Sequence, residues 1–537
     1  MTNPFHFPRN IRKMILNNVK VKREIQFQGK GFICSLINSR CHIGCNHCMF
    51  SSNMDEKKNN QNTMTTKRLD KLMKLVKDSN TGYLLISGGG EGFLELPLMY
   101  QIVEKSNADL TWMVTSAFWA KEKEKAIIIL NNLYTFYLKG NRRLNFKRKI
   151  CIRVSFDSYH VQKLSKNSNT PLDYIINIIR IFESTYSTQG GFFLQLHAME
   201  EEYFLVEQLK DKISAIQVKN TSSIHNNEKA TESVIKLQLP SGYNFEITFA
   251  KLLLSDLTVD IRNKKLLDKR IDLWEKDALI NEEGFPSCHV NKDGLIGTDM
   301  LIIYNGRVSG GWQSELSDVT INIDKDDYSQ IMDKTLSDVA VLSTIEYGLK
   351  YRFDIINEIC SKAIIRAKAV NIRDYTSLIL FEEDIVKAYY SIRVVQDFIN
   401  KGRIKEKDIE SYPSELKEII NMTKEELISL YKSSEYDIIQ QFEEKEKGFK
   451  IFLEEIRIFS KTKNSIVFIQ NLLEKIGDDL FYFDKWRILL KRISCDWYDI
   501  TSIKDIDSFI LKDVELLIDT KILKGRRVYD GLRGGDL

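Results

Sequence analysis

The strongest constraint on this chain is a run of three cysteines within eight residues, Cys41, Cys45 and Cys48. We call residues 41–48 the cysteine loop; it comes shortly after residues 31–37, an apolar stretch typical of a buried strand. Three thiolates with this spacing can hold a [4Fe–4S] cluster and leave one iron without a protein ligand. Such an iron binds a substrate or cofactor, whereas a cluster held by four cysteines mostly transfers electrons. The spacing therefore predicts chemistry at an iron.

Two other uses of these cysteines stay open at this level. Structural zinc needs four ligands, and Cys34, His42 or His47 would have to supply the fourth. The two histidines each adjoin a cysteine in a tight loop, which places them poorly for the same metal. Disulfides or free thiols are less favoured, because eight cysteines in 537 residues are sparse and the chain starts without a secretory signal.

Composition narrows the class of protein. Hydrophobic residues make up 43% and charged residues 28% of the chain, as in ordinary globular proteins. The net charge is only +4, which leaves no clear nucleic-acid footprint. No apolar run reaches the roughly 18 residues of a membrane helix. We therefore expect a protein of the reducing cytoplasm, where an oxygen-labile cluster is protected.

Apolar runs alternate with helical stretches in the first part of the chain. The expected strands are residues 31–37, 82–87, 110–115, 151–156 and 192–197. Short strands separated by helices predict an α/β fold with a parallel sheet, whose working residues collect at the carboxyl ends of the strands. The cysteine loop, the glycine run 88–90 and the segment 155–160 all fall at such ends.

The chain divides into three expected regions. Residues 1–215 hold the α/β unit with an N-terminal extension, and residues 216–338 form a mixed α/β segment that completes or covers it. Hairpins are expected around Pro240-Ser241-Gly242 and around Asn305-Gly306. Residues 339–537 read as a helical C-terminal domain.

Two local patterns support the helical reading. An apolar stripe runs along Val386, Tyr389, Ile392, Val395 and Ile399, and Thr423 to Glu426 has the form of a capping box.

The motifs at the first two strand ends resemble those of the radical SAM superfamily. Cys41-x3-Cys45-x2-Cys48 matches its cluster loop, and Ser87-Gly88-Gly89-Gly90-Glu91 is similar to its Gly-Gly-Glu-Pro motif. An extra glycine is present here, and Gly92 stands where proline is usual. The resemblance covers roughly residues 28–200 and implies a partial (β/α)6 barrel. It carries no information about residues 340–537.

The resemblance also implies an activity. The open iron would bind the amino and carboxylate groups of S-adenosylmethionine (SAM), and the reduced cluster would cleave SAM to a 5′-deoxyadenosyl radical that abstracts hydrogen from a substrate. The electron would come from a donor of the flavodoxin or ferredoxin type. The substrate is a peptide or protein on resemblance alone, with the helical domain as a docking surface. A small metabolite or nucleotide remains an alternative, as does a non-enzymatic Fe–S or zinc interaction protein.

The glycine run suits a place beside SAM. Without Cβ atoms, Gly88, Gly89 and Gly90 let the backbone approach the methionine part of the cofactor. Glu91 corresponds to the glutamate of the family motif and is assigned to the same site.

The end of the fourth strand supplies further candidates. Ser155 and Asp157 share one face of that strand, and in related enzymes such residues bind the ribose or carboxylate of SAM. The alternative is that they cap the next helix. His160 is a catalytic candidate that reaches the substrate or only supports the loop. Weaker candidates for the same pocket are Thr115, Ser116 and Gln195.

The remaining cysteines argue against further clusters. Cys34, Cys151, Cys288, Cys360 and Cys495 have no close partners in sequence, so the auxiliary clusters of SPASM or twitch domains are not expected. Cys288 is a second catalytic candidate, as a substrate-facing thiol or hydrogen donor. A buried structural cysteine is the alternative.

We predict that replacing Cys41, Cys45 and Cys48 together by alanine abolishes the cluster, because no other ligand set is available to it. About four irons per chain are expected after anaerobic reconstitution of the unaltered protein. Iron analysis and the visible absorption spectrum measure both. A normal cluster spectrum in the triple variant would refute the ligand assignment.

Overall fold

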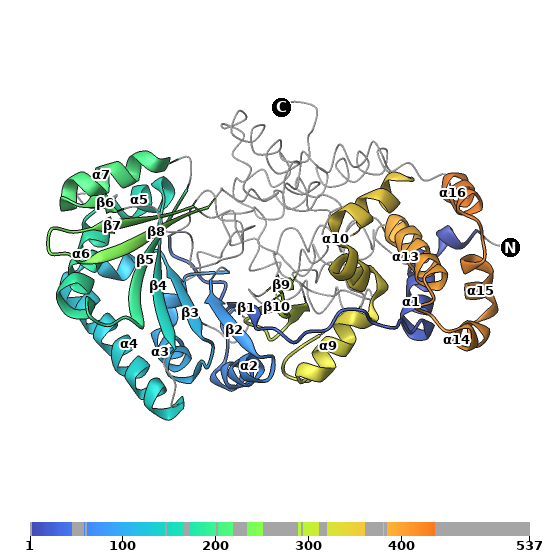
Figure 1. Ribbon diagram of the computed structural model, residues 1–537, viewed down its shortest axis with the longest axis horizontal. Helices are drawn as coiled ribbons and strands as arrows, with labels where there is room; N and C mark the ends of the chain where they lie inside the picture. The colour runs from blue at the N-terminus through green and yellow to red at the C-terminus, as the bar shows by residue number, and fades with distance from the viewer. Residues whose placement is uncertain are drawn as a thin grey trace, which may run out of the picture.

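The computed structural model describes residues 3–43, 45, 58, 62–87, 89–144, 148–165, 172–199, 202–218, 233–250, 288–290, 294–310, 319, 321–359, 380 and 384–434. In these residues the chain forms one large sheet with helices packed along it and a second group of helices beside β10 (Figure 1). None of the described helices is long and apolar enough to span a lipid bilayer.

Within the described residues the sheet has 11 strands, in the order β11-β10-β1-β2-β3-β4-β5-β8-β7-β6, with β9 paired to β10. Its parallel part comprises β10 (Ile296–Ile303), β1 (Gly31–Leu36), β2 (Thr81–Ile86), β3 (Leu110–Thr115), β4 (Lys149–Phe156), β5 (Phe192–Met199) and β8 (Asn244–Ala250). The antiparallel strands are β6 (Ile216–Val218), β7 (Ser233–Gln238), β9 (Cys288–Val290) and β11 (Val308–Gly310). The predicted α/β class with a parallel sheet is confirmed.

Helices connect the parallel strands. They are α2 (Thr66–Asp78), α3 (Leu96–Lys105), α4 (Lys123–Leu144), α5 (Ser158–Ser165), α6 (Asp173–Ile181) and α7 (Tyr203–Ile213), with short helical turns η2 (Gly92–Glu95), η3 (Phe118–Lys121) and η4 (Phe182–Tyr186). In α2, Thr65 caps the amino end by accepting a hydrogen bond from the Arg68 amide, and Leu69, Leu72 and Val76 are buried on one side. Such apolar stripes hold the helices against the sheet.

Alternation along the strands gives the sheet two different faces. On β4, Ile152 and Val154 belong to the core shared with the helices, and we call this side the outer face. Cys151, Arg153 and Ser155 alternate with them and therefore lie on the opposite, inner face. Cys151 clusters there with Leu110 and Trp112. The polar side chains of β5 and β8 that lie opposite Arg153 and Ser155 share this inner face, whereas Thr111 and Thr115 of β3 lie on the outer face.

The middle region of the chain extends the sheet at both ends. The hairpin of β7 and β8 continues it beyond β5, and β10 lies parallel to β1 on the other side. Both predicted hairpins are present, because β7 pairs with β8 and β10 pairs with β11 in antiparallel fashion. Gly242 and Gly306 supply the positive φ angles, 87° and 88°, that the two turns require.

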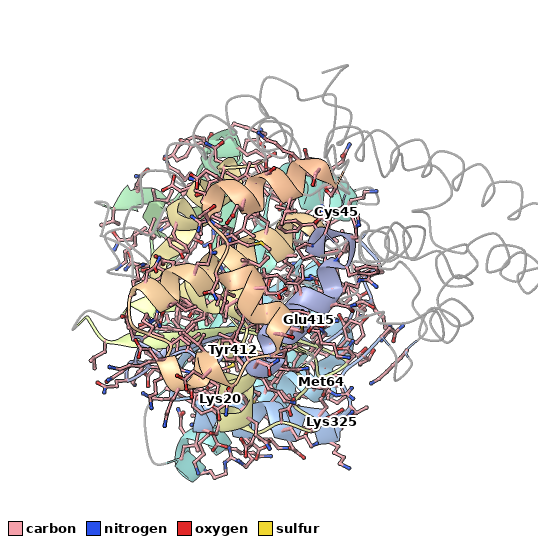
Figure 2. All side chains as sticks on the ribbon, turned by 90° about the vertical axis from the view of Figure 1, so that its right-hand side faces the viewer. Lys20, Cys45, Met64, Lys325, Tyr412 and Glu415 are labelled. Carbon is pink, nitrogen blue, oxygen red and sulfur yellow. The ribbon has the colours of Figure 1, made fainter. Side chains whose placement is uncertain are left out.

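The second group of helices includes the start of the chain. It consists of η1 (Pro4–His6), α1 (Pro8–Asn18), α9 (Tyr328–Ser337), α10 (Val339–Asn357), α13 (Asp384–Asn400), α14 (Glu406–Glu410), α15 (Ser414–Ile420) and α16 (Lys424–Ser433), which we call the helical unit. Phe5, Ile11 and Ile15 share a buried core with Tyr389 and Phe398 of α13. Figure 1 shows α1 beside α13 and α15, and Figure 2 looks at the helical unit from its own side.

Sequence patterns in the helical unit hold where they are described. Of the predicted stripe, Val386, Tyr389, Ile392 and Val395 are fully buried, and Ile399 is half-buried against the same core. Thr423 forms the predicted capping box.

A buried ion pair fixes the segment between α1 and β1 to the helical unit. Arg403 donates to the Lys22 carbonyl from Nε (3.0 Å) and Nη2 (2.7 Å), and its Nη1 lies 2.6 Å from Glu346 Oε2. The other oxygen of Glu346 accepts hydrogen bonds from the amides of Glu24 (2.9 Å) and Ile25 (3.2 Å). Both side chains of the pair are nearly inaccessible to water. The segment that leads into β1 is therefore fixed relative to the helical unit.

We predict that Glu346→Ala lowers the free energy of unfolding by about 3 kcal/mol, because it removes the buried carboxylate partner of Arg403 and leaves only the exposed Glu24, 3.7 Å away. Urea unfolding followed by circular dichroism measures this difference. Asp333→Ala is the matched control, since it removes an exposed ion pair with Arg23 between the same two parts of the chain. An equal effect of the two substitutions would contradict the prediction.

Candidate functional site

The predicted site residues come together where parallel strands end. The cysteine loop begins five residues after Leu36, the last residue of β1. Residue 89 follows β2, Thr115 ends β3 and Asp157 follows β4. Neighbouring strands are in parallel register, with Ser35 opposite Ile86 and Thr115 opposite Val154. Their carboxyl ends therefore meet at one edge of the sheet, as the sequence predicted.

Two of the three loop cysteines lie in the described part of the chain. Cys45 is buried and Cys41 is half-buried, and neither forms a disulfide. Cys48 and His47 lie outside the described residues, as does Gly88. Figure 2 labels Cys45.

The surroundings of the loop bear on the zinc alternative. Cys34 and His42 are the described candidates for a zinc ligand beside Cys41 and Cys45. Among the described residues, no three histidine, cysteine or acidic side chains lie together as a metal site. The His42 ring instead packs edge-on against Phe118, with ring centroids 4.2 Å apart. The Cys34 sulfur lies 3.9 Å from the Ser87 carbonyl.

Gly89 and Gly90 of the glycine run pack directly against residues 38–40, just before the cysteine loop. A Cβ atom on Gly89 would approach the Asn38 carbonyl oxygen closer than 3.0 Å, and one on Gly90 would do the same at Arg40. Gly89 also has a positive φ of 67°, which favours glycine. The Glu91 amide donates to the Arg40 carbonyl at 2.7 Å. Gly89 and Gly90 are therefore required for the close approach to residues 38–40, which lead into the cysteine loop, a role the sequence did not reveal.

Glu91 joins the end of β2 to the end of β3. Its buried carboxylate accepts hydrogen bonds from the Phe93 amide (3.0 Å) and the Thr115 hydroxyl (2.9 Å) on Oε1. On Oε2 it accepts the amide (2.7 Å) and hydroxyl (2.6 Å) of Ser116. Thr115 and Ser116, predicted as minor pocket residues, are thus partners of Glu91. Four donors on one carboxylate fix the two strand ends relative to each other.

Asp157 and His160 form a pair beside the cysteine loop. Asp157 Oδ1 accepts the His160 amide at 2.9 Å, so Asp157 caps α5, as the capping alternative required. Its Oδ2 lies 2.6 Å from His160 Nδ1. Burial opposes a charge on the ring, but Asp157 and a hydrogen bond with the Cys45 sulfur raise the pKa of His160 well above its usual value. The structure therefore brings His160 to a cysteine of the loop.

A second polar cluster lies on the inner face near the ends of β4, β5 and β8. Arg153 Nη2 lies 2.7 Å from His197 Nδ1 and 3.1 Å from Thr248 Oγ1. Burial, and then the nearby Arg153 charge, lower the pKa of His197 to about 3, so this imidazole is neutral at physiological pH. Half-buried Ser155 lies opposite His197, and Gln195 donates to Glu246 at 3.3 Å. Sequence reasoning missed Arg153 and His197, although both interrupt apolar strands.

The other cysteines do not join these groups in the described part of the chain. Cys151 is buried on the inner face, and burial raises the pKa of its thiol well above the usual range, which makes it unreactive. Cys288 begins β9 opposite Thr298, and its side chain lies outside what the structure describes.

Comparison with known proteins gives one family. Residues 27–156 match the model of a 4Fe–4S single cluster domain, a family associated with radical SAM proteins. The matched range begins just before β1 and ends with β4, so it contains the cysteine loop, the glycine run and Glu91. A search of curated proteins gave no match. The match supports an iron–sulfur protein similar to radical SAM proteins and extends to none of the helical unit's described helices α9–α16.

We predict that Gly90→Ala lowers the amount of cluster bound per chain, because the new Cβ would displace the Arg40 carbonyl beside Cys41. Iron and sulfide analysis after anaerobic reconstitution measures the loss. Gly190→Ala is the control, since a Cβ at Gly190 would meet nothing within 4 Å. Normal cluster content in Gly90→Ala would show that the contact does not shape the loop.

Proposed function

We propose that this chain is a radical SAM enzyme that holds one [4Fe–4S] cluster through Cys41, Cys45 and Cys48 and cleaves SAM reductively. The observation that carries the proposal is the junction between residues 89–91 and residues 38–40, which lead into the cysteine loop. It is centred on the 2.7 Å hydrogen bond from the Glu91 amide to the Arg40 carbonyl. The junction lies inside the range that matches a 4Fe–4S single cluster domain. The cysteine motif and the glycine motif thereby lie side by side at the carboxyl ends of β1 and β2.

The donor set suits the cluster. Cys41 and Cys45 offer thiols at the end of a parallel strand, and Cys48 follows with the spacing of a third ligand. The buried position of Cys45 limits access of water and oxidants to its sulfur. When bound, the cluster would supply the electron that breaks a carbon–sulfur bond of SAM and so generates the adenosyl radical that takes hydrogen from the substrate.

The chain's own residues would hold SAM from two strand ends. The backbone of the glycine run, Gly88 to Gly90, is the proposed contact for the methionine part. We infer that Glu91 acts through its four hydrogen bonds, which fix the ends of β2 and β3 around that contact. Both oxygens of Asp157 bond to His160, so Ser155 is the stronger of the two proposed contacts for the ribose or carboxylate.

The substrate proposed is a peptide or protein, and the support for it is the resemblance to radical SAM enzymes. Substrate would approach the inner face, where Arg153 and neutral His197 offer hydrogen-bonding groups near Asp157. His160 and Cys288 remain catalytic candidates. An electron donor of the flavodoxin or ferredoxin type and a cytoplasmic location complete the proposal, because the cluster must be reduced and kept from oxygen.

We predict that the anaerobically reconstituted protein releases 5′-deoxyadenosine when given SAM and dithionite, even without its substrate. Chromatography of the quenched reaction measures this product. Cys45→Ala is the control and should release none, since it removes a cluster ligand. A protein with a full cluster but no product would be a non-enzymatic iron–sulfur protein, and a protein that takes up zinc instead of iron would overturn the cluster.

A further inference from the structure

We propose that Glu95 is a positioning residue for the cluster ligands, a buried carboxylate that ties together the two flanks of the cysteine loop. The inference rests on the proposed function, because it concerns how the chain holds the cluster. Glu95 ends η2 and directly precedes α3. It lies four residues after Glu91 and outside both sequence motifs.

The contacts of Glu95 reach chain segments on both sides of the loop. Its Oε1 pairs with Arg40 Nη1 and accepts a hydrogen bond from the Thr63 hydroxyl at 3.4 Å. Its Oε2 lies 2.7 Å from Lys58 Nζ. Arg40 immediately precedes Cys41, whereas Lys58 and Thr63 follow Cys48. One carboxylate therefore bonds to the chain before and after the three ligands.

Backbone hydrogen bonds close the same loop next to Glu95. The Ser39 amide donates to the Asn62 carbonyl at 2.9 Å, and the Met64 amide donates to the Ile37 carbonyl at 2.8 Å. These bonds align the two flanks as a short antiparallel pair, with Asn38 bridged to Thr63. They set the distance between the flanks, but they leave the side chain and carbonyl of Arg40 to be fixed by other contacts.

Charge and burial explain why Glu95 can fix Arg40. Only 1% of the Glu95 side chain is exposed, and a buried carboxylate is costly unless cations and hydrogen-bond donors satisfy it. The Arg40 side chain is also largely buried, so water screens this pair little. Movement of Arg40 would break this buried pair and leave the half-exposed Lys58 as the cation beside Glu95. Since the Arg40 carbonyl accepts the Glu91 amide, the residue before the first ligand is held at both ends.

The test compares how variants bind the cluster after anaerobic reconstitution. Glu95→Gln should release iron to a chelator about 10- to 100-fold faster than the unaltered chain, the usual effect of losing a group that orients a ligand. The electron paramagnetic resonance spectrum of the reduced cluster should also change. Lys58→Gln should have a smaller effect in the same direction, because Lys58 is 57% exposed.

Two further variants separate positioning from general stability. The double variant Glu95→Gln, Lys58→Gln should lose iron no faster than Glu95→Gln alone, because both substitutions break one interaction. Lys105→Gln removes an ion pair with Asp70 on the neighbouring helices, away from the loop, and should match the unaltered protein. A purely structural role would shift the unfolding midpoint of the iron-free protein and leave the spectrum of the bound cluster unchanged.

The outcomes distinguish this inference from the proposed function. If the unaltered chain binds no cluster, the proposed function fails and this inference fails with it. If the unaltered chain binds a cluster and Glu95→Gln has the same iron content, spectrum and release rate, only the role of Glu95 is overturned. If Glu95→Gln does not fold, the Lys58→Gln variant provides the test. An iron-release rate for Lys58→Gln equal to that of Lys105→Gln would overturn the proposed role of Glu95.

Discussion

The close approach of two backbone segments, residues 38–40 and 89–91, is the constraint on which the site depends. A hydrogen bond of 2.7 Å joins the Glu91 amide to the Arg40 carbonyl, and the space beside it admits only glycine. β1 and β2 lie parallel and in register just before these segments, so the sheet itself brings them together. The segment that leads into the cysteine loop is thus fixed by a contact between neighbouring strand ends.

Two buried carboxylates stabilise this contact from different sides. Glu91 faces the end of β3 and satisfies its charge with four neutral donors, whereas Glu95 faces the loop flanks and pairs with Arg40 and Lys58. The difference matters physically. Neutral donors fix geometry with little dependence on salt, while the Lys58 pair is half in water and is screened. The contacts of Glu91 at the strand ends therefore depend little on salt, whereas the contact between Glu95 and Lys58 is weakened by it.

Sequence patterns predicted what depends on local periodicity and failed where partners are distant. The parallel strands, both hairpins and the capping box at Thr423 follow from short-range signals, and they are confirmed. The Arg153–His197 pair depends on which strands become neighbours and in what register, which no local pattern contains. Glu95 looks like an ordinary helix-start acid in the sequence. Its partners Arg40 and Lys58 are distant from Glu95 in the sequence, so only the three-dimensional structure reveals these ion pairs.

The packing of the N-terminal residues connects the helical unit to the strand that precedes the cysteine loop. Phe5, Ile11 and Ile15 are buried among helices that follow residue 330, and the chain then passes the Arg403–Glu346 pair and enters β1. β1 in turn leads to the cysteine loop and has β10 as its parallel neighbour on the other side. Helices distant in sequence therefore hold the strand that leads to the proposed cluster ligands. Removing them would expose the apolar side of α1 and free the start of β1, so cluster binding and the helical unit are physically coupled.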